Sequence, residues 1–143
     1  MRALLDVNVL IALLDAAHVH HHLASRWLAD HIEHGWASCP LTQLGCIRVM
    51  SQSAYPNMQP AARVAERLQS AAAARHHEFW SADADLLAPD TVRWGDLLTS
   101  RHATDAYLLA LAAAHGGRFV TFDRHVPVRA VPSADARHLA VIG

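Results

Sequence analysis

The fold is decided by residues 104–123, TDAYLLALAAAHGGRFVTFD. Residues 106–115 are apolar almost all round, which predicts a buried helix. The glycine pair at 116–117 supplies a stop at the C-terminal end of that helix. Residues 119–122 are mostly aromatic or β-branched and predict a short strand, which ends at Asp123. The stretch is therefore expected to be a helix, a turn and a strand that closes on a carboxylate.

Acidic residues stand at the ends of these apolar elements. Asp105 follows a threonine at the start of the predicted helix, where a hydroxyl cap and a first-turn acid are favoured. The N-terminus is arranged similarly, because apolar residues 3–5 lead into Asp6, and Asn8 follows two residues later. An unpaired charge among apolar residues is costly. Asp6, Asp105 and Asp123 therefore mark the candidate site.

The rest of the chain alternates between expected strands and helices. Strands are expected at residues 3–6, 36–39, 78–80, 119–122 and 138–142. Helices are expected at residues 8–14, from the histidine cluster 18–22 to about 34, 40–50, 60–75, 89–98 and 104–115. This alternation predicts an α/β fold with a mostly parallel sheet. Ligands of such sheets gather at the carboxyl ends of the strands, so we expect the three acids at one edge.

Length and composition limit the class of protein. With 143 residues, we expect one domain that covers 1–143. No apolar run is long enough for a bilayer and the N-terminus lacks the features of a signal peptide, so a cytoplasmic protein is expected. Cys39 and Cys46 are expected to be buried thiols rather than a disulfide.

The net charge of −1 does not by itself indicate a nucleic-acid-binding protein. All 12 basic residues are arginines, which can grip a phosphate with two hydrogen bonds. The arginines expected nearest the acids, as contacts for a phosphate backbone, are Arg48, Arg101, Arg124 and Arg129. For Arg48, a structural ion pair on its own helix is an equal alternative.

Three converging carboxylates without lysines to match them favour a divalent cation. Oxygen ligands select Mg²⁺ or Mn²⁺ over zinc, and such an ion can activate a water for phosphodiester hydrolysis. We expect Asn8, Thr104 and Thr121 to support the site. The residues alone leave a plainer alternative open, in which Asp6 and Asp105 cap helices and Asp123 lies in a turn.

Histidines offer a different metal site. Residues His18, His20, His21 and His22 lie within five positions, and the first and last of them are four apart, so that they could pair on one helix face to bind zinc. The favoured interpretation is that this cluster lies at the solvent-exposed N-terminal end of a helix. His102 and His125 flank the acidic site in sequence, and a surface role is expected for each.

Four stretches together resemble the PIN-domain family, and within it the VapC-type toxin ribonucleases of type II toxin–antitoxin pairs. They are LLDVNVLIALL at 4–14, CPLTQLGCIRVMS at 39–51, TDAYLLALAAAHGGRFVTFDR at 104–124 and the final HLAVI. The resemblance implies a three-layer α/β/α sandwich, an acidic pocket for Mg²⁺ or Mn²⁺, and cleavage of RNA. It also implies a homodimer and a cognate antitoxin protein as partner.

The family's acids fall on Asp6, Asp105 and Asp123, and the threonine before the last acid falls on Thr121. Where the family often has a glutamate, this chain has Gln43, which contributes no charge. The leading hypothesis is a metal-dependent endoribonuclease that leaves 5′-phosphate and 3′-hydroxyl ends. The alternative is a PIN-like binding module with weak catalysis, which acts mainly through a protein partner.

Overall fold

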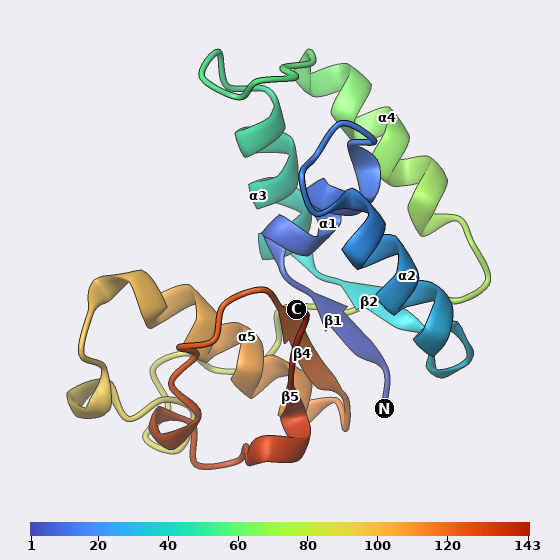
Figure 1. Cartoon of the computed structure of the whole chain (residues 1–143). Helices are drawn as coiled ribbons and strands as arrows, with labels where there is room; N and C mark the ends of the chain where they lie inside the picture. Colours follow the sequence, from blue (N-terminus) through green and yellow to red (C-terminus); the bar gives the residue numbers. More distant parts are fainter.

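The structure, a computed structural model, describes all residues 1–143 and is built around a sheet of five parallel strands (Figure 1). The strands are β1 (Ala3–Leu5), β2 (Trp36–Ser38), β3 (His77–Phe79), β4 (Arg118–Thr121) and β5 (Leu139–Val141), in the spatial order β3-β2-β1-β4-β5. The predicted α/β fold with a parallel sheet is confirmed. Because β1 and β4 are neighbours at the centre, the acids that follow them leave the sheet at the same edge.

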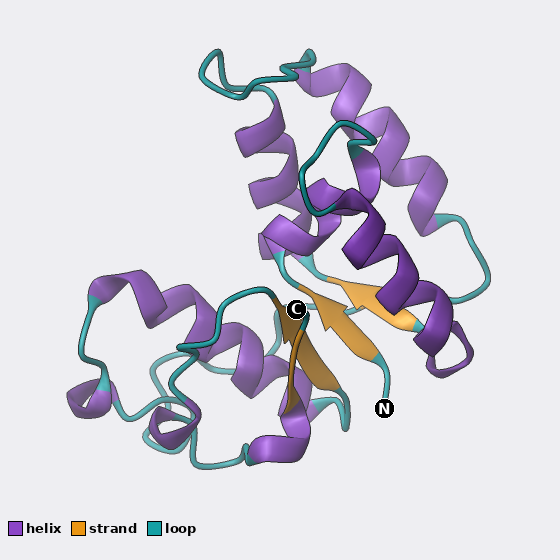
Figure 2. Ribbon diagram, in the orientation of Figure 1, coloured by secondary structure: helices purple, strands orange, loops and turns teal.

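Helices cover both faces of the sheet (Figure 2). The α-helices are α1 (Val7–Leu14), α2 (His21–His31), α3 (Pro40–Met50), α4 (Ala61–Ala72) and α5 (Ala103–Ala114). Short 3₁₀ turns are η1 (Ile32–His34), η2 (Trp94–Asp96), η3 (Ser100–His102), η4 (Val128–Ala130) and η5 (Ala136–His138). None of the helices is long and apolar enough to cross a membrane.

Two hydrophobic cores hold the three layers together. On one face α1 to α4 pack on alternate strand residues such as Leu5 and Val120. On the other face α5 and the loops around it pack on Leu4 and Phe119. The alternation follows from the period of two in a strand. Helix α5 is buried along seven consecutive residues, as the apolar sequence predicted.

One predicted helix is wrong. Residues 89–98 form turns and the single 3₁₀ turn η2 rather than an α-helix. The backbone N–H of Arg93 donates to the carbonyl oxygen of Ala130 at 2.7 Å, so a long-range contact replaces the intrahelical bond that a helix would need. Gly95 within the segment also disfavours a helix. The segment is therefore a loop pinned to the loop that follows β4.

Two smaller expectations concern single residues. Helix α5 begins at Ala103, so Thr104 lies inside the first turn and does not cap it, and the predicted capping role is wrong. The residue before the helix, His102, makes no side-chain cap bond. Cys39 and Cys46 are both buried free thiols, as expected.

Candidate metal centre

Asp6 connects the central strand β1 to helix α1. Its carboxylate caps the helix, where Oδ1 accepts a hydrogen bond of 2.7 Å from the backbone N–H of Val7. Its other oxygen, Oδ2, accepts a bond of 2.7 Å from the hydroxyl of Thr121. The residue is only 9% exposed. Asp6 therefore caps a helix and also faces the edge of the sheet where the other acids lie.

Thr121, at the end of β4, links two of the acids. It is buried, and while its hydroxyl donates to Asp6 it accepts a bond of 3.1 Å from the backbone N–H of Asp123. The carboxylate of Asp123 in turn accepts a bond of 2.7 Å at Oδ1 from the N–H of His125. These hydrogen bonds hold Asp6, which follows β1, and Asp123, which follows β4, in fixed positions relative to each other.

Helix α5 carries the third acid, and the 3₁₀ turn η3 directly before it carries a histidine that lies close to the acids. One ligand atom from each of His102, Asp105 and Asp123 lies within 4.8 Å of the others. Nε2 of His102 is 3.6 Å from Oδ2 of Asp123. These three residues are partly buried, and no other group of three histidine, cysteine or acidic side chains in the chain lies so close together.

Burial and neighbouring negative charge raise the pKa of two of the acids, Asp6 and Asp105. Burial is the main cause that raises the pKa of Asp105 to about 6, and the charges of Asp6 and Asp123 add to the effect, while His102 opposes it. Burial also raises the pKa of Asp6, although its bonds from Thr121 and Val7 lower it in part. Burial first, and the neighbouring acids after it, therefore disfavour the ionised forms of Asp6 and Asp105 in the metal-free site.

The donor set suits a divalent cation. None of the three acids forms an ion pair with an arginine, and the one basic side chain within salt-bridge distance of them is the His102 imidazole. Carboxylate oxygens without a cationic partner are the ligands that Mg²⁺ and Mn²⁺ prefer, and an imidazole is compatible with Mn²⁺ and other transition metals. The residues present therefore fit the ion that the sequence led us to expect.

Gln43 lies in α3, and its hydrogen bond is not directed at the acids. Its amide nitrogen donates to the hydroxyl of Ser38 at 3.0 Å, and that hydroxyl also bonds to His77 Nε2 at 2.8 Å. The side chain lines a small cavity between α3 and α4, together with Leu68. The amide is therefore occupied by a structural network on the α1–α4 face of the sheet.

The remaining predicted residues lie at the surface. Asn8 is exposed on the first turn of α1, and Thr104 is exposed beside an apolar hollow at the start of α5. The predicted phosphate contacts Arg48, Arg101, Arg124 and Arg129 are all exposed. Of these, Arg124 donates to the carbonyl of Gly143 at 3.3 Å.

His102 is the residue whose place the sequence reasoning underrated. It precedes Asp105 by three positions, and residues three apart lie on one face of a helix, so this spacing was the available signal. The histidine cluster of the zinc alternative does not converge. Nδ1 of His18 accepts a bond from the His20 N–H at 3.0 Å, and Nδ1 of His21 bonds the Ala12 carbonyl at 2.7 Å.

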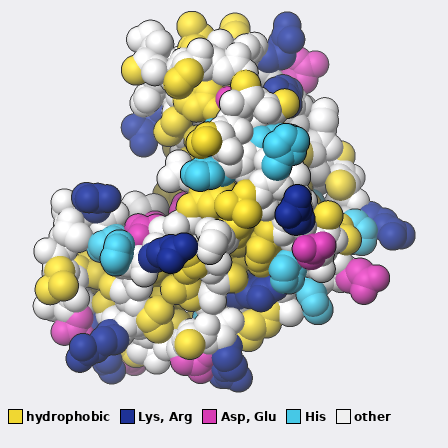
Figure 3. Space-filling view, viewed as in Figure 1, with side chains coloured by type: hydrophobic (Ala, Val, Ile, Leu, Met, Phe, Trp, Pro, Cys, Tyr) yellow, Lys and Arg dark blue, Asp and Glu magenta, His cyan; other side chains and the backbone are white.

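The acids open onto a hollow in the surface. In the space-filling view, a notch separates the α1–α4 half of the molecule from the α5 half, and acidic and histidine side chains show on its sides (Figure 3). The carboxyl ends of β1 and β4 point into this region (Figure 1).

Comparisons with known proteins agree with this architecture. The PIN domain profile matches residues 3–132. Ribonuclease VapC44 of Mycobacterium tuberculosis is 50% identical over 142 residues, which cover 99% of this chain and 100% of that protein. Ribonuclease VapC39 of the same organism is 41% identical over 125 residues, or 86% of this chain and 89% of that protein.

A solved structure shows the same fold. The crystal structure of VapBC2 from Rickettsia felis bound to a DNA fragment from their promoter contains a chain that matches with a TM-score of 0.63. The match covers 100% of both chains at 13% sequence identity. At so low an identity the match supports the arrangement of strands and helices rather than the chemistry.

Proposed function

The chain belongs to the PIN-domain family and to its VapC-type group, and from this premise we propose that it is the ribonuclease toxin of a type II toxin–antitoxin pair. The reaction is the endonucleolytic hydrolysis of RNA phosphodiester bonds. The observation that carries the proposal is that ligand atoms of Asp105, Asp123 and His102 lie within 4.8 Å of one another. Thr121 links Asp6 to Asp123, and no arginine pairs with any of the three acids.

We propose that these three carboxylates hold Mg²⁺ or Mn²⁺, with His102 beside them. When bound, the ion would supply activation of a water and neutralisation of the charge that develops on the phosphate. The ion would favour the ionised form of Asp105, whose pKa is raised to about 6 without metal, so that binding would release a proton below that pH. Thr121 keeps the Asp6 carboxylate oriented, since its hydroxyl donates to Oδ2.

The substrate and partners follow from the group to which the chain belongs. We propose that an RNA strand reaches the acids from the notch and that Arg48, Arg101 and Arg124 contact its phosphates. Asn8 and Thr104 would support the strand or the ion from the first turns of α1 and α5. We further propose a cognate antitoxin protein as inhibitor, a homodimer as the working form, and the cytoplasm as the compartment, where RNA is available.

Incubation of the purified, antitoxin-free chain with mixed RNA tests the proposal. Reactions with Mg²⁺, Mn²⁺ or EDTA run beside the variant Asp105→Asn. We expect metal-dependent cleavage that the variant loses, and products with 5′-phosphate and 3′-hydroxyl ends, because water rather than the ribose hydroxyl attacks phosphorus. Products that end in a 2′,3′-cyclic phosphate would contradict the mechanism.

One observation favours a second candidate, a binding module with weak catalysis. Gln43 replaces the glutamate that VapC-type chains often carry, and its amide is bonded to Ser38. A site with one charge fewer holds a cation less tightly. Titration with Mn²⁺ separates the two functions, because a folded chain that binds no Mn²⁺ at millimolar ion favours the binding module.

A further inference from the structure

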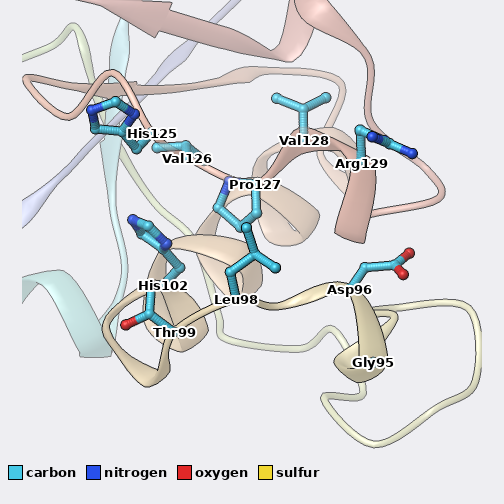
Figure 4. A pocket seen from close by; sticks show the side chains of 10 residues that line it. All are labelled: Gly95, Asp96, Leu98, Thr99, His102, His125, Val126, Pro127, Val128 and Arg129. Atoms are coloured by element: carbon cyan, nitrogen blue, oxygen red, sulfur yellow. The ribbon is translucent and has the colours of Figure 1, made fainter.

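A cavity of about 730 Å³ adjoins the acids on the α5 side of the sheet, between the loop with η2 and η3 and the loop that follows β4 (Figure 4). His102 and His125 line the end next to the acids, and Asp96 and Arg129 lie toward the other end. This cavity belongs to the candidate metal centre, because His102 is 3.6 Å from Asp123. Polar side chains that the proposed reaction does not use gather instead on the α1–α4 face, near the edge strand β3.

Three side chains on this face form a hydrogen-bond relay that joins β3 to α3. Nε2 of His77, on β3, lies 2.8 Å from the hydroxyl of Ser38 at the end of β2. The same hydroxyl oxygen accepts a bond of 3.0 Å from the amide of Gln43, near the start of α3. The His77 ring also bonds the backbone of Ala72, the last residue of α4. The relay therefore ties together two strands and two helices.

The direction of each bond in the relay follows from what each group can donate while His77 is neutral. A carbonyl oxygen only accepts, so the ring nitrogen that faces Ala72 carries the proton. A neutral imidazole has a single N–H, and Nε2 must therefore accept from the hydroxyl of Ser38. Because that hydroxyl donates to the ring, its oxygen is left to accept from Gln43. Every bond of the relay is then satisfied.

Protonation of His77 is incompatible with this order. An imidazolium donates from both nitrogens, so the hydroxyl of Ser38 can no longer donate to Nε2. The structure gives this hydroxyl no partners besides His77 and Gln43, and its proton is left without an acceptor. An unsatisfied buried donor is costly. The Gln43 amide must therefore turn over to present its oxygen, or its bond to Ser38 is lost.

The surroundings of His77 oppose a positive charge on its ring. Burial is the largest cause that lowers the pKa of His77 from its ordinary value of 6.5, and the charge of Arg2 acts in the same direction. The bond to Ala72 and the charge of Glu78 oppose both. Arg2 and Glu78 are 3.5 Å apart, so that these two charges largely offset each other. The residues of α3 and α4 that line the small cavity beside Gln43 are uncharged.

The relay acts on the conformation of α3 rather than in a reaction. A serine beside a histidine could serve as nucleophile and base, but Ser38 is fully buried and no substrate reaches its hydroxyl. Two residues after Gln43, Gly45 packs so close to α1 that a Cβ there would lie 2.6 Å from a methyl group of Val7. Val7 is the first residue of α1, the helix that Asp6 caps. The relay therefore holds the part of α3 that packs beside this cap.

We propose that the relay of Gln43, Ser38 and His77 is a pH-sensitive latch between α3 and the edge strand β3, closed while the His77 ring is neutral and opened when it takes up a proton. The pKa of His77 is lower in the folded protein than its ordinary value of 6.5. The contribution of the latch to stability is therefore complete above about pH 6.5 and is lost as the pH falls through the folded-state pKa. The latch does not depend on the proposed ribonuclease function, since none of the three acids takes part in it.

Nuclear magnetic resonance of the ¹⁵N-labelled, metal-free chain tests both ends of the latch during a pH titration. The ring nitrogen shifts of His77 should show Nε2 without a proton above the midpoint of its titration. The side-chain amide resonances of Gln43 should move with the same midpoint, below pH 6.5. Ser38→Ala removes the link, so that Gln43 should no longer follow the ring. The control is His76→Gln, which replaces a neighbouring histidine that bonds Arg75 at 3.3 Å and should leave the Gln43 titration unchanged.

The outcomes decide the inference even if one variant is unstable. Where Ser38→Ala fails to fold, His77→Gln answers the same question, because an amide takes up no proton and the Gln43 titration should vanish. Gln43 resonances that stay constant while the His77 ring is protonated would refute the latch. Resonances that still follow the ring in Ser38→Ala, or still titrate with the same midpoint in His77→Gln, would refute it as well. A proton on Nε2 of the neutral ring would contradict the direction of the bonds and overturn the inference.

Discussion

The substitution Asp105→Asn should stabilise the metal-free protein while it removes activity. The pKa of Asp105 is raised from its ordinary value of 3.8 to about 6, chiefly by burial and then by the neighbouring acids. A shift of about two units corresponds to about 3 kcal/mol of destabilisation when the group is ionised. Because the side chain keeps some contact with solvent, we halve this figure to about 1.5 kcal/mol.

The effect has a defined dependence on pH. In the folded protein Asp105 holds its proton more tightly than in the unfolded chain, so the free energy of unfolding falls as the pH rises from about 4 to about 6. The asparagine has no proton to lose. The advantage of the variant is therefore absent below about pH 4, grows through this window, and is complete above about pH 6.

Thermal denaturation in EDTA, followed by circular dichroism at several pH values, measures this difference. A gain of about 1.5 kcal/mol corresponds to a rise in Tm of about 3–6 °C for a chain of this size. The control is Asp30→Asn, which replaces an exposed aspartate of α2 and should leave Tm unchanged.

Mn²⁺ at about 100 times its Kd should stabilise the wild type by about 2.7 kcal/mol, so that its Tm then exceeds that of Asp105→Asn. A variant with an unchanged or lower Tm at neutral pH in EDTA would show that the carboxylate is not under electrostatic strain.

Two further substitutions test residues that contact the acids. His102→Gln should lower the affinity for Mn²⁺ more than the affinity for Mg²⁺, because an imidazole is a better ligand for Mn²⁺. Calorimetric titration measures both affinities. Pulsed electron paramagnetic resonance should show nitrogen coupling to bound Mn²⁺ in the wild type and none in the variant. Equal losses for both ions, or no nitrogen coupling in the wild type, would exclude the histidine as a ligand. Thr121→Val should cost about 1–3 kcal/mol in urea denaturation, because Asp6 Oδ2 and the Asp123 N–H both lose a buried partner, and activity should fall with it. A fully active Thr121→Val would show that the orientation of Asp6 does not depend on this hydroxyl.

The sequence predicts the parts of this molecule that follow from local pattern. Apolar runs, and the residues that end them, predicted buried strands next to Asp6 and Asp123 and a buried helix next to Asp105. The parallel topology then brings residues more than 100 positions apart to one edge, as Leu5 and Val120 are paired in register. The three acids could be grouped from sequence because each lies at the end of a strongly patterned element.

The failures occur where long-range contacts decide the local structure. Residues 89–98 look helical by composition, but the bond from Arg93 to Ala130 holds them as a loop. That loop in turn lines the cavity beside the acids. Nothing in the local sequence shows a hydrogen bond between segments almost 40 positions apart. His102 is a different case, because its place three residues before Asp105 was a local signal in the sequence.

Gln43 and the raised pKa of Asp105 are two aspects of the same electrostatic problem. Burial, and after it the charges of Asp6 and Asp123, raises the pKa of Asp105 to about 6 in the metal-free chain. A fourth carboxylate pointed at these acids would add further repulsion whenever no ion is bound. An amide avoids this repulsion, and its bond to Ser38 holds it on the α1–α4 face of the sheet. We therefore expect Gln43 to spare the metal-free protein this repulsion. The proposed cation would then be held by the three acids and His102, and the site would depend more on that imidazole.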